Sequence, residues 1–265
     1  MRDIGNFPFG QPILPVSQAD RSKKDVFVLG VYASAVHAKW IDNCGKLRIK
    51  AVAVASEPEI FWRGGSAEDI INAIKIPPEA GRLESAGERF NGPSGKSLDE
   101  DFLKPLGLSR KDTWLCDLVP HSCINAGQTK ALKREYYHDM ELLDLPEPKW
   151  PPLPKTLADE KRLTEIESEI LESSASILIT LGDHPLKYFA SLYGAYQSLK
   201  KYGEIEKDYG KLHEITIAGK LMHLLPLVHP RQADKLGSHS IKWHDLHDGW
   251  KKSIAPKLLA SFKKA

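Results

Sequence analysis

Short apolar runs alternate along the chain with segments whose apolar residues recur at helical spacing. The runs predict buried strands at residues 26–32, 47–55, 113–119, 176–182 and 222–230. The intervening segments predict helices over residues 66–76, 97–106, 130–145, 156–172 and 239–262, the first of them capped by Ser66. Strands that alternate with helices in this way are joined by right-handed crossovers, so we expect a mostly parallel sheet between two layers of helices.

This pattern predicts a single three-layer α/β/α domain over residues 1–265. Residues 1–24 are expected to form an extended N-terminal arm over the domain, and residues 250–265 a basic C-terminal tail or helix. Ligands of such sheets bind outside the carboxyl ends of the strands. That rule directs the search for chemistry to predicted loops at residues 30–37, 56–65, 117–128 and 229–237.

Composition excludes several classes of protein. Lys and Arg number 37 and Asp and Glu 35, and the resulting net charge of +2 excludes a histone-like polycation, although one basic face could still bind nucleic acid. The chain has 3 cysteines and no Cys-x-x-Cys pair, which excludes a zinc ribbon or a four-cysteine iron–sulfur cluster. We therefore expect no metal and no cofactor.

The apolar runs are also too short for a membrane protein. The longest uncharged, mostly apolar run covers residues 26–36, well below the roughly 20 residues that a spanning helix needs. The N-terminus has prolines and no signal pattern. We expect an intracellular, soluble protein, cytoplasmic or, in a eukaryote, nuclear, with no obligate protein partner.

Two motifs resemble ligand sites only superficially. Residues 92–97 read GPSGKS, but a nucleotide-binding P-loop requires a glycine where Phe90 stands and a buried strand before it. We interpret this stretch as a glycine turn that leads into the helix at Ser97, with amides that could hold a nucleic-acid phosphate. No further metal ligand at a fixed spacing accompanies the clustered histidines His239, His244 and His247.

Four segments occur in an order that matches a known family. They are LGVYAS (29–34), RFNGPSGKSLDEDFLKPLGLSRKDTWLCDLVPHSC (89–123), ILITLG (177–182) and PLVHPRQ (226–232). The second resembles the Phe-x-Gly-x-Ser/Ala-Gly, helix, Gly-Leu, strand, Asn-x-Val pattern of the uracil-DNA glycosylase superfamily, and the fourth resembles its His-Pro-Ser loop. The resemblance covers residues 26–245. It implies a DNA partner, from which a damaged or deaminated base is flipped and its N-glycosidic bond hydrolysed.

The resemblance implies roles for individual residues. His229 would donate to a carbonyl oxygen of the departing base, where negative charge develops, and Phe90 would stack on the flipped base. Gly30 and Val31 would bring backbone amides close to the base and sugar. Contacts to flanking phosphates or to the minor groove would come from Ser34, His37, Ser94, Gly95, Arg231 and Gln232.

Two departures from the family pattern bear on catalysis. Tyr32 stands where the superfamily often has Asp, Asn or Glu to orient water, and a phenol is a poor base at neutral pH. Asp117 stands where the pattern has an Asn that reads the uracil edge, and an ionised carboxylate can only accept hydrogen bonds. Asp117 has three interpretations: it selects another base, it organises the water, or it faces away and caps a loop.

These observations leave competing functions. The first is a monofunctional DNA glycosylase in which Phe90 and His229 meet in one cavity. The second is a catalytically impaired protein of this fold that binds DNA or a nucleobase without excision, and the third is an unrelated nucleotide hydrolase, which would need a metal site. Phe61 and Trp62 are equally compatible with a pocket wall and with a hydrophobic plug beneath a helix.

Overall fold

The computed structural model describes residues 3–235 and 240–259. The chain forms two compact units, each built from three segments. The small-sheet unit comprises Met1–Val16, Tyr32–Gly95 and Pro120–Lys155, and the large-sheet unit comprises Ser17–Val31, Lys96–Val119 and Thr156–Ala265. The two units interleave along the sequence, and one domain over residues 1–265 stays a prediction.

The predicted apolar runs form strands, two of them with the predicted bounds. The described strands are β1 (Val26–Tyr32), β2 (Ala35–Ile41), β3 (Leu47–Ser56), β4 (Arg82–Ser85), β5 (Thr113–Val119), β6 (Ile177–Leu181), β7 (His213–Ile217) and β8 (Lys220–Leu227). The sequence pattern does not predict β2, β4 or β7. The first of these is the most informative omission, because it lies where a ligand-binding loop was expected.

The helices are shorter than predicted. They are α1 (Ala67–Asn72), α2 (Pro93–Ser97), α3 (Ala126–Ala131), α4 (Glu160–Ser173), α5 (Asp183–Tyr188), α6 (Pro230–Ala233), α7 (Ser240–Ser253) and α8 (Ala255–Leu258). Wider or tighter turns continue α2 and α3, as η3 (Leu98–Leu103), η4 (Lys104–Leu106) and η6 (Leu132–Tyr136). Ser66 occupies the N-cap position of α1 as predicted, but its φ is +60° and its side chain makes no capping hydrogen bond. Of the helices in the described ranges, none is both long and apolar enough to cross a bilayer.

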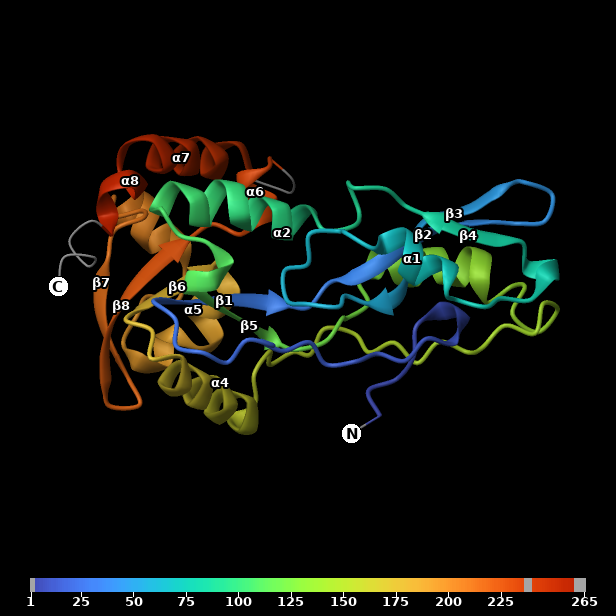
Figure 1. Cartoon of the computed structure of the whole chain (residues 1–265), viewed down its shortest axis with the longest axis horizontal. Coiled ribbons are helices and arrows are strands. Elements are labelled where there is room, and N and C mark those ends of the chain that lie inside the picture. The colour runs from blue at the N-terminus through green and yellow to red at the C-terminus, as the bar shows by residue number, and fades with distance from the viewer. Residues whose placement is uncertain (1–2, 236–239, 260–265) are drawn as a thin grey trace. The chain divides into compact units, whose positions relative to one another are not determined.

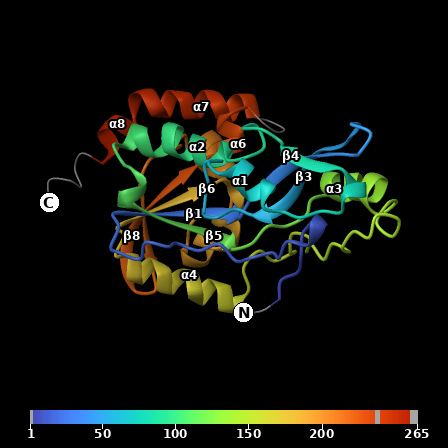
Figure 2. The same ribbon diagram turned by 45° about the vertical axis from the view of Figure 1, so that its right-hand side comes forward.

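A mostly parallel sheet, in the order β5-β1-β6-β8-β7, forms the large-sheet unit. β1 and β8 each pair in parallel with β6, whereas the edge strand β7 is antiparallel to β8. Ala218 and Gly219, which join β7 to β8, both have positive φ, as tight hairpin turns require. Figures 1 and 2 show α7 on one face of this sheet and α4 on the other. The predicted mostly parallel α/β architecture is therefore confirmed.

The order of the strands contains a switch point between β1 and β6. After β1 the chain adds β5 on one side of β1, and it then crosses to add β6 on the other side. In open α/β sheets, ligands bind at the carboxyl ends of the two strands where the order reverses. Pairing between β1 and β6 ends at Leu29 and Thr180, so Gly30 and Val31 extend beyond it.

An antiparallel sheet, in the order β3-β2-β4, forms the small-sheet unit. It corrects two expectations. Residues 47–55 form a strand of this sheet rather than of the parallel one. Residues 30–37 are not a loop, because β1 continues to Tyr32 and β2 begins at Ala35. In β2, buried Val36, Ala38 and Trp40 alternate with more exposed polar residues, as in a strand with one face on a core.

Aromatic residues form the core of the small-sheet unit. Trp40 is fully buried against Phe9 and Tyr136, with ring centroids 5.6 and 5.9 Å away. The backbone N–H of Phe9 donates to the hydroxyl of Tyr136 at 3.0 Å. Phe9 belongs to the predicted N-terminal arm, so the described part of this arm contributes a buried side chain to the core.

Candidate functional site

His229 follows β8 at the carboxyl end of the large sheet, as its sequence position predicts. The neighbouring strand β6 ends at Leu181, and the next residue, Gly182, donates its N–H to the carbonyl of Leu227 at 2.8 Å. Gly182 has φ +84° and ψ −170°, a combination that is strained for any other residue. A Cβ atom at Gly182 would lie 3.3 Å from the Cβ atom of His229. The end of β6 is therefore packed directly against His229.

The hydrogen bonds of His229 determine which ring nitrogen carries its proton. The backbone N–H of Arg231 donates to Nδ1 at 3.2 Å, so Nδ1 presents a lone pair. Burial, and to a smaller extent the positive charges of Arg231 and His184, lower the pKa of His229 to about 4. At neutral pH the ring is uncharged and carries its proton on Nε2. Within the described residues Nε2–H has no hydrogen-bond partner, so it is available to an acceptor.

The turn after His229 is fixed by its own side chains. The His229 N–H donates to Oε1 of Gln232 at 3.4 Å, and Pro230 occupies the first position of α6. Gln232, which the resemblance implies as a DNA contact, uses its side-chain oxygen to cap this turn. Arg231 is exposed. The predicted loop extends to residue 237, and residues 236–239, including His239, lie outside the described part of the chain.

His184 is a neighbour of His229 that the sequence analysis missed. It lies on α5, two residues after Gly182, and its side chain is exposed. Its charge contributes to the lowered pKa of His229, which indicates that the two imidazoles are close. The preceding Asp183 accepts from the N–H of Leu199 at 2.6 Å and so fixes the start of α5. Ligands bind at the carboxyl ends of parallel strands, and residues 177–185 (ILITLGDHP) include the end of β6. A search of the two residues after Gly182 would therefore have found His184.

Asp117 lies on β5 and is 3% exposed. Trp114 and Cys116, which precede Asp117 on the same strand, face α4: Trp114 Nε1 donates to Glu169 at 2.8 Å, and Arg162 donates to the sulfur of Cys116 at 3.0 Å. Because side chains alternate along a strand, Asp117 points to the opposite face of the sheet. Within the described residues its carboxyl group has no hydrogen bond. The loop-capping interpretation therefore has no support.

The environment of Asp117 changes its chemistry. Burial raises the pKa of this carboxyl to about 7, and the positive charge of Arg162 opposes the shift only in part. The side chain is therefore about half protonated at neutral pH. A protonated carboxyl offers one donor and one acceptor, as the amide of Asn does. The expectation that Asp117 can only accept hydrogen bonds holds only for its ionised fraction.

Phe90 and His37 are held together within the small-sheet unit. The side chain of Asn91 accepts from the N–H of His37 at 2.7 Å and donates to its carbonyl at 2.9 Å. Burial lowers the pKa of His37 to about 4, although backbone hydrogen bonds to Ala35 and Phe90 oppose the shift, so the ring is neutral at pH 7. Phe90 is half-buried, and Nζ of Lys50 lies 5.9 Å from the centroid of its ring. Asn91, which follows Phe90 in the motif, thus joins the loop that carries both residues to β2.

The structure corrects the expected glycine turn. Ser94 and Gly95 lie inside α2, and a Cβ atom on Gly95 would come within 2.1 Å of the carbonyl oxygen of Phe61. Gly95 is therefore needed for close packing of two backbones. Ser34 differs too, because its N–H donates to the buried Glu57 carboxylate at 3.0 Å. The amide of Ser34 is engaged within the protein.

Phe61 and Trp62 are both buried, at 9% and 5% exposure. Trp62 belongs to the hydrophobic core of the small-sheet unit, together with Val54 and Ile71. The plug interpretation is therefore confirmed for Trp62. Phe61 has φ +52°, in the left-handed region, where it begins the turn that brings the chain to Gly64 and its close approach to Asn91.

The predicted site residues are divided between the two units. The small-sheet unit holds Tyr32, Ser34, His37, Phe90, Ser94 and Gly95. The large-sheet unit holds Gly30, Val31, Asp117, His229, Arg231 and Gln232. The structure brings Gly182 and His184 together with His229 in the large-sheet unit. The convergence of Phe90 with His229 in one cavity stays a prediction.

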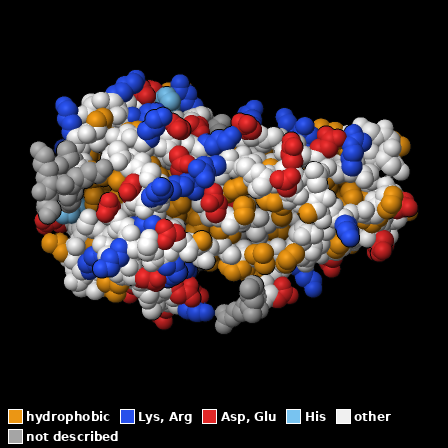
Figure 3. Space-filling model, viewed as in Figure 1, with side chains coloured by type: hydrophobic (Ala, Val, Ile, Leu, Met, Phe, Trp, Pro, Cys, Tyr) orange, Lys and Arg blue, Asp and Glu red, His pale blue; other side chains and the backbone are white. Residues whose placement is uncertain are grey.

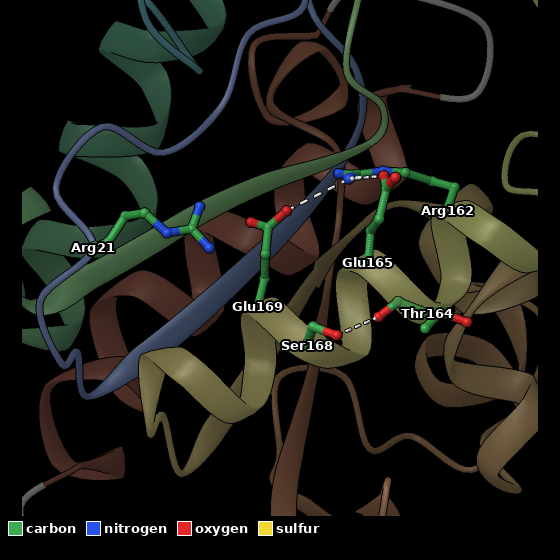
Figure 4. Close-up of a pocket in the computed structure, with 6 residues that line it drawn as sticks. All are labelled: Arg21, Arg162, Thr164, Glu165, Ser168 and Glu169. Atoms are coloured by element: carbon green, nitrogen blue, oxygen red, sulfur yellow. Dashed lines mark hydrogen bonds and ion pairs between the residues drawn. The ribbon is translucent and has the colours of Figure 1, made fainter.

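A pocket of about 280 Å³ lies along α4, and one of its lining residues, Arg162, also donates to the backbone carbonyl of Asp117 at 2.7 Å. Figure 4 shows its lining, in which Arg162 points toward Glu165 and Glu169, at 3.1 and 3.5 Å. These charges neutralise one another, and none of the lining residues was predicted for the site. Across the described part of the chain, no group of three His, Cys, Asp or Glu side chains is placed as a metal site requires.

The packing at Gly182 gives a first prediction. Gly182→Ala is expected to lower the free energy of unfolding by about 1–3 kcal/mol, because of the strained φ and ψ, and to displace His229. Gly194→Ala is the matched control, since Gly194 has φ +89° but open space around it. Urea unfolding measures the first effect, and the pKa of His229 by NMR measures the second. A His229 pKa that changes equally in both variants would contradict the direct contact.

Neither a model of a known protein family nor a curated protein matches this chain.

Proposed function

We propose that this chain is a monofunctional DNA glycosylase, which flips a damaged or deaminated base out of DNA and hydrolyses its N-glycosidic bond. The observation that carries the proposal is the neutral Nε2–H of His229 at the carboxyl ends of β6 and β8. The four sequence segments that resemble the uracil-DNA glycosylase superfamily support the same activity. The helix layers on both faces of the large sheet fit the three-layer architecture that this resemblance implies.

The proposed chemistry needs a donor for the departing base. As the C1′–N bond breaks, its electron pair leaves with the base and the sugar gains oxocarbenium character. Negative charge spreads onto the carbonyl oxygens of the base, where the Nε2–H of His229 donates. A preorganised donor of this kind stabilises the transition state more than the ground state. Water then adds to C1′ and loses a proton, which balances the proton that the free base takes up.

Asp117 is the residue that would select the base. In its protonated form it presents the donor and acceptor pair that the family pattern obtains from Asn, and this pair matches the edge of uracil. In its ionised form it accepts only, which suits an edge with adjacent N–H groups. The proportion of the two forms changes near neutral pH, so base preference is expected to depend on pH.

Binding to DNA would depend on exposed cations that contact its phosphates. On the face seen in Figure 3, basic and acidic side chains are interspersed. Arg231, which is exposed and follows His229 closely in the chain, would contact a phosphate or enter the minor groove. We therefore expect binding to weaken with salt, by about 0.9 log units of affinity per tenfold change in salt for each phosphate contacted.

The experiment that tests the proposal is a screen of base release. Duplex and single-stranded oligonucleotides that contain uracil, hypoxanthine, xanthine, or an oxidised or alkylated base are incubated with the full chain, and free base is measured by chromatography. Release of one of these bases, without added metal and in the presence of EDTA, is the expected result. The absence of release from every one of these oligonucleotides would contradict the proposal, whether or not the chain binds DNA.

A second candidate function is binding without excision. Tyr32 favours it, because the residue is 37% exposed and is a phenol where the family often has an acid or amide. Tight binding to a lesion-containing duplex with no release of base at any pH would favour this candidate. Release of base from the same duplex would exclude it.

A further inference from the structure

A buried chain of hydrogen bonds connects α7 to the residue before His229. The backbone N–H of Val228 donates to the hydroxyl of Tyr209 at 3.3 Å, and this hydroxyl lies 2.7 Å from Nδ1 of His247. On the other side of the imidazole, Nε2 lies 3.0 Å from the carbonyl oxygen of Asp101. Tyr209 and His247 are 6% and 1% exposed, so water does not compete for these bonds.

The groups at the two ends of this hydrogen-bond network determine which partner donates in each of its bonds. The Asp101 carbonyl can only accept, so Nε2 of His247 carries the proton. Nδ1 therefore has a lone pair and accepts from the hydroxyl of Tyr209. The oxygen of Tyr209 in turn accepts from the N–H of Val228. Burial lowers the pKa of His247 to about 4, which keeps this neutral arrangement intact at pH 7.

Close packing holds the segment that carries Tyr209 in place. The indole N–H of Trp250, one turn after His247 on α7, donates to the carbonyl of Gly210 at 3.0 Å. A Cβ atom on Gly210 would lie 2.1 Å from the Trp250 ring, and the His247 and Trp250 rings stack with centroids 5.0 Å apart. The hydroxyl of Tyr209 thus has little freedom to move away from the Val228 N–H.

The same peptide unit leads directly into the candidate site. Val228 is fully buried, and the residue after it is His229, whose ring accepts from the Arg231 N–H and whose backbone N–H donates to Gln232 Oε1. The capping bonds fix His229 only relative to α6. The Tyr209 hydroxyl fixes the backbone that enters the turn relative to α7 and the sheet. Two independent sets of bonds therefore determine where Nε2–H points.

We propose that Tyr209 and His247 are positioning residues, which hold the backbone at Val228 so that His229 presents its Nε2–H in one direction. The role in base release rests on the proposed glycosylase function, whereas the positioning itself does not. Tyr209 contributes a hydroxyl that both donates and accepts, and His247 contributes the acceptor that orients this hydroxyl. The aromatic ring of Tyr209 contributes packing that a Phe would retain.

The first test uses the protein without DNA. In Tyr209→Phe we expect the Val228 amide to exchange its hydrogen about tenfold faster, as the loss of one buried hydrogen bond implies. We also expect ¹⁵N NMR of the imidazoles to show a mixture of tautomers at His229 and a shifted Nδ1 resonance at His247. Tyr202→Phe is the matched control, because Tyr202 is also buried, also lies against a histidine ring and also accepts one backbone N–H, from Tyr196.

The second test measures base release from the oligonucleotide that the wild-type chain cleaves. Tyr209→Phe is expected to lower kcat about tenfold with KM unchanged, and Tyr202→Phe to leave both unchanged. His247→Gln keeps a donor close to Nε2 for Asp101 and has no acceptor at the position of Nδ1 for Tyr209, so it is expected to lower kcat in the same way. Equal kcat values for Tyr209→Phe, Tyr202→Phe and the wild type would overturn the role in catalysis.

The two tests separate the two proposals. A wild-type chain that releases no base would contradict the glycosylase function, and the NMR results would still decide whether Tyr209 positions His229. Unchanged Val228 exchange and an unchanged His229 tautomer in Tyr209→Phe would overturn the positioning, whatever the activity. If Tyr209→Phe does not fold, His247→Gln provides the same two measurements.

Discussion

His229→Ala is expected to lower the rate of base release by about 10²–10³-fold, or about 3–4 kcal/mol of transition-state stabilisation. The loss is large because the removed Nε2–H is aimed from a fixed turn and would donate where charge develops on the base. A single-turnover assay with saturating protein isolates the chemical step, and a gel-shift assay reports DNA binding. Binding is expected to change little, because the donor acts mainly in the transition state.

His229→Gln is the informative companion variant. Its side-chain amide can donate from a position close to that of Nε2, so part of the lost rate is expected to return. The contribution of His229 is also expected to be constant from about pH 5.5 to about pH 8, since burial holds the pKa of its ring at about 4. A folded His229→Ala variant with the wild-type rate would remove the imidazole from the reaction.

The large sheet could be predicted from the sequence because its strands carry their signal locally. The residues from Val26 to Leu29 are fully buried on both faces of the sheet, and such strands are continuous apolar runs. The small sheet could not be predicted in the same way. β2 alternates apolar residues with His37 and Lys39, and a short alternating segment directly after a strand also fits a loop. Its partners lie later in the chain, so only tertiary pairing identifies it.

The candidate site was predictable in position but not in chemistry. The rule of strand carboxyl ends located His229, and it would also have located His184. The tautomer of His229 depends on the Arg231 N–H, and the positioning of Val228 depends on Tyr209, which lies 19 residues earlier in the chain. These features arise from contacts between distant segments, which composition and spacing do not encode.

Asp117 shows most clearly what burial adds to sequence. As a residue type it is an anion at pH 7, and the sequence analysis treated it as one. In the structure, burial raises the pKa of its carboxyl from 3.8 to about 7. The folded protein therefore holds a proton that the unfolded chain releases at lower pH. This difference makes stability depend on pH and, under the proposed function, is expected to make base preference depend on pH as well.

Asp117→Asn is expected to stabilise the protein at high pH. Between about pH 4 and pH 7 the unfolded chain ionises Asp117 while the folded chain keeps it protonated, so the wild-type free energy of unfolding falls as pH rises. The accumulated cost is about 4 kcal/mol above pH 7. Asn cannot ionise, so the stability difference between variant and wild type is expected to grow from near zero at about pH 4 to about 4 kcal/mol at about pH 8. Urea unfolding of both proteins across this pH range measures the stability difference. The buried histidines titrate in both proteins, so their contributions cancel in the difference.

The same variant decides what Asp117 does in the reaction. If the protonated carboxyl of Asp117 binds the base edge as an amide would, the rate of uracil release by the wild type falls about tenfold for each pH unit above 7. Asp117→Asn then has the wild-type rate of low pH and keeps it above pH 7. If the ionised carboxylate instead organised water, the wild-type rate would rise through pH 7 and the variant would lose it. The two roles of Asp117 predict opposite changes of the wild-type rate as pH rises. Because burial brings the pKa of this carboxyl to about 7, both changes occur in an accessible pH range. One pH–rate profile of the wild type and one of the variant therefore distinguish the two roles.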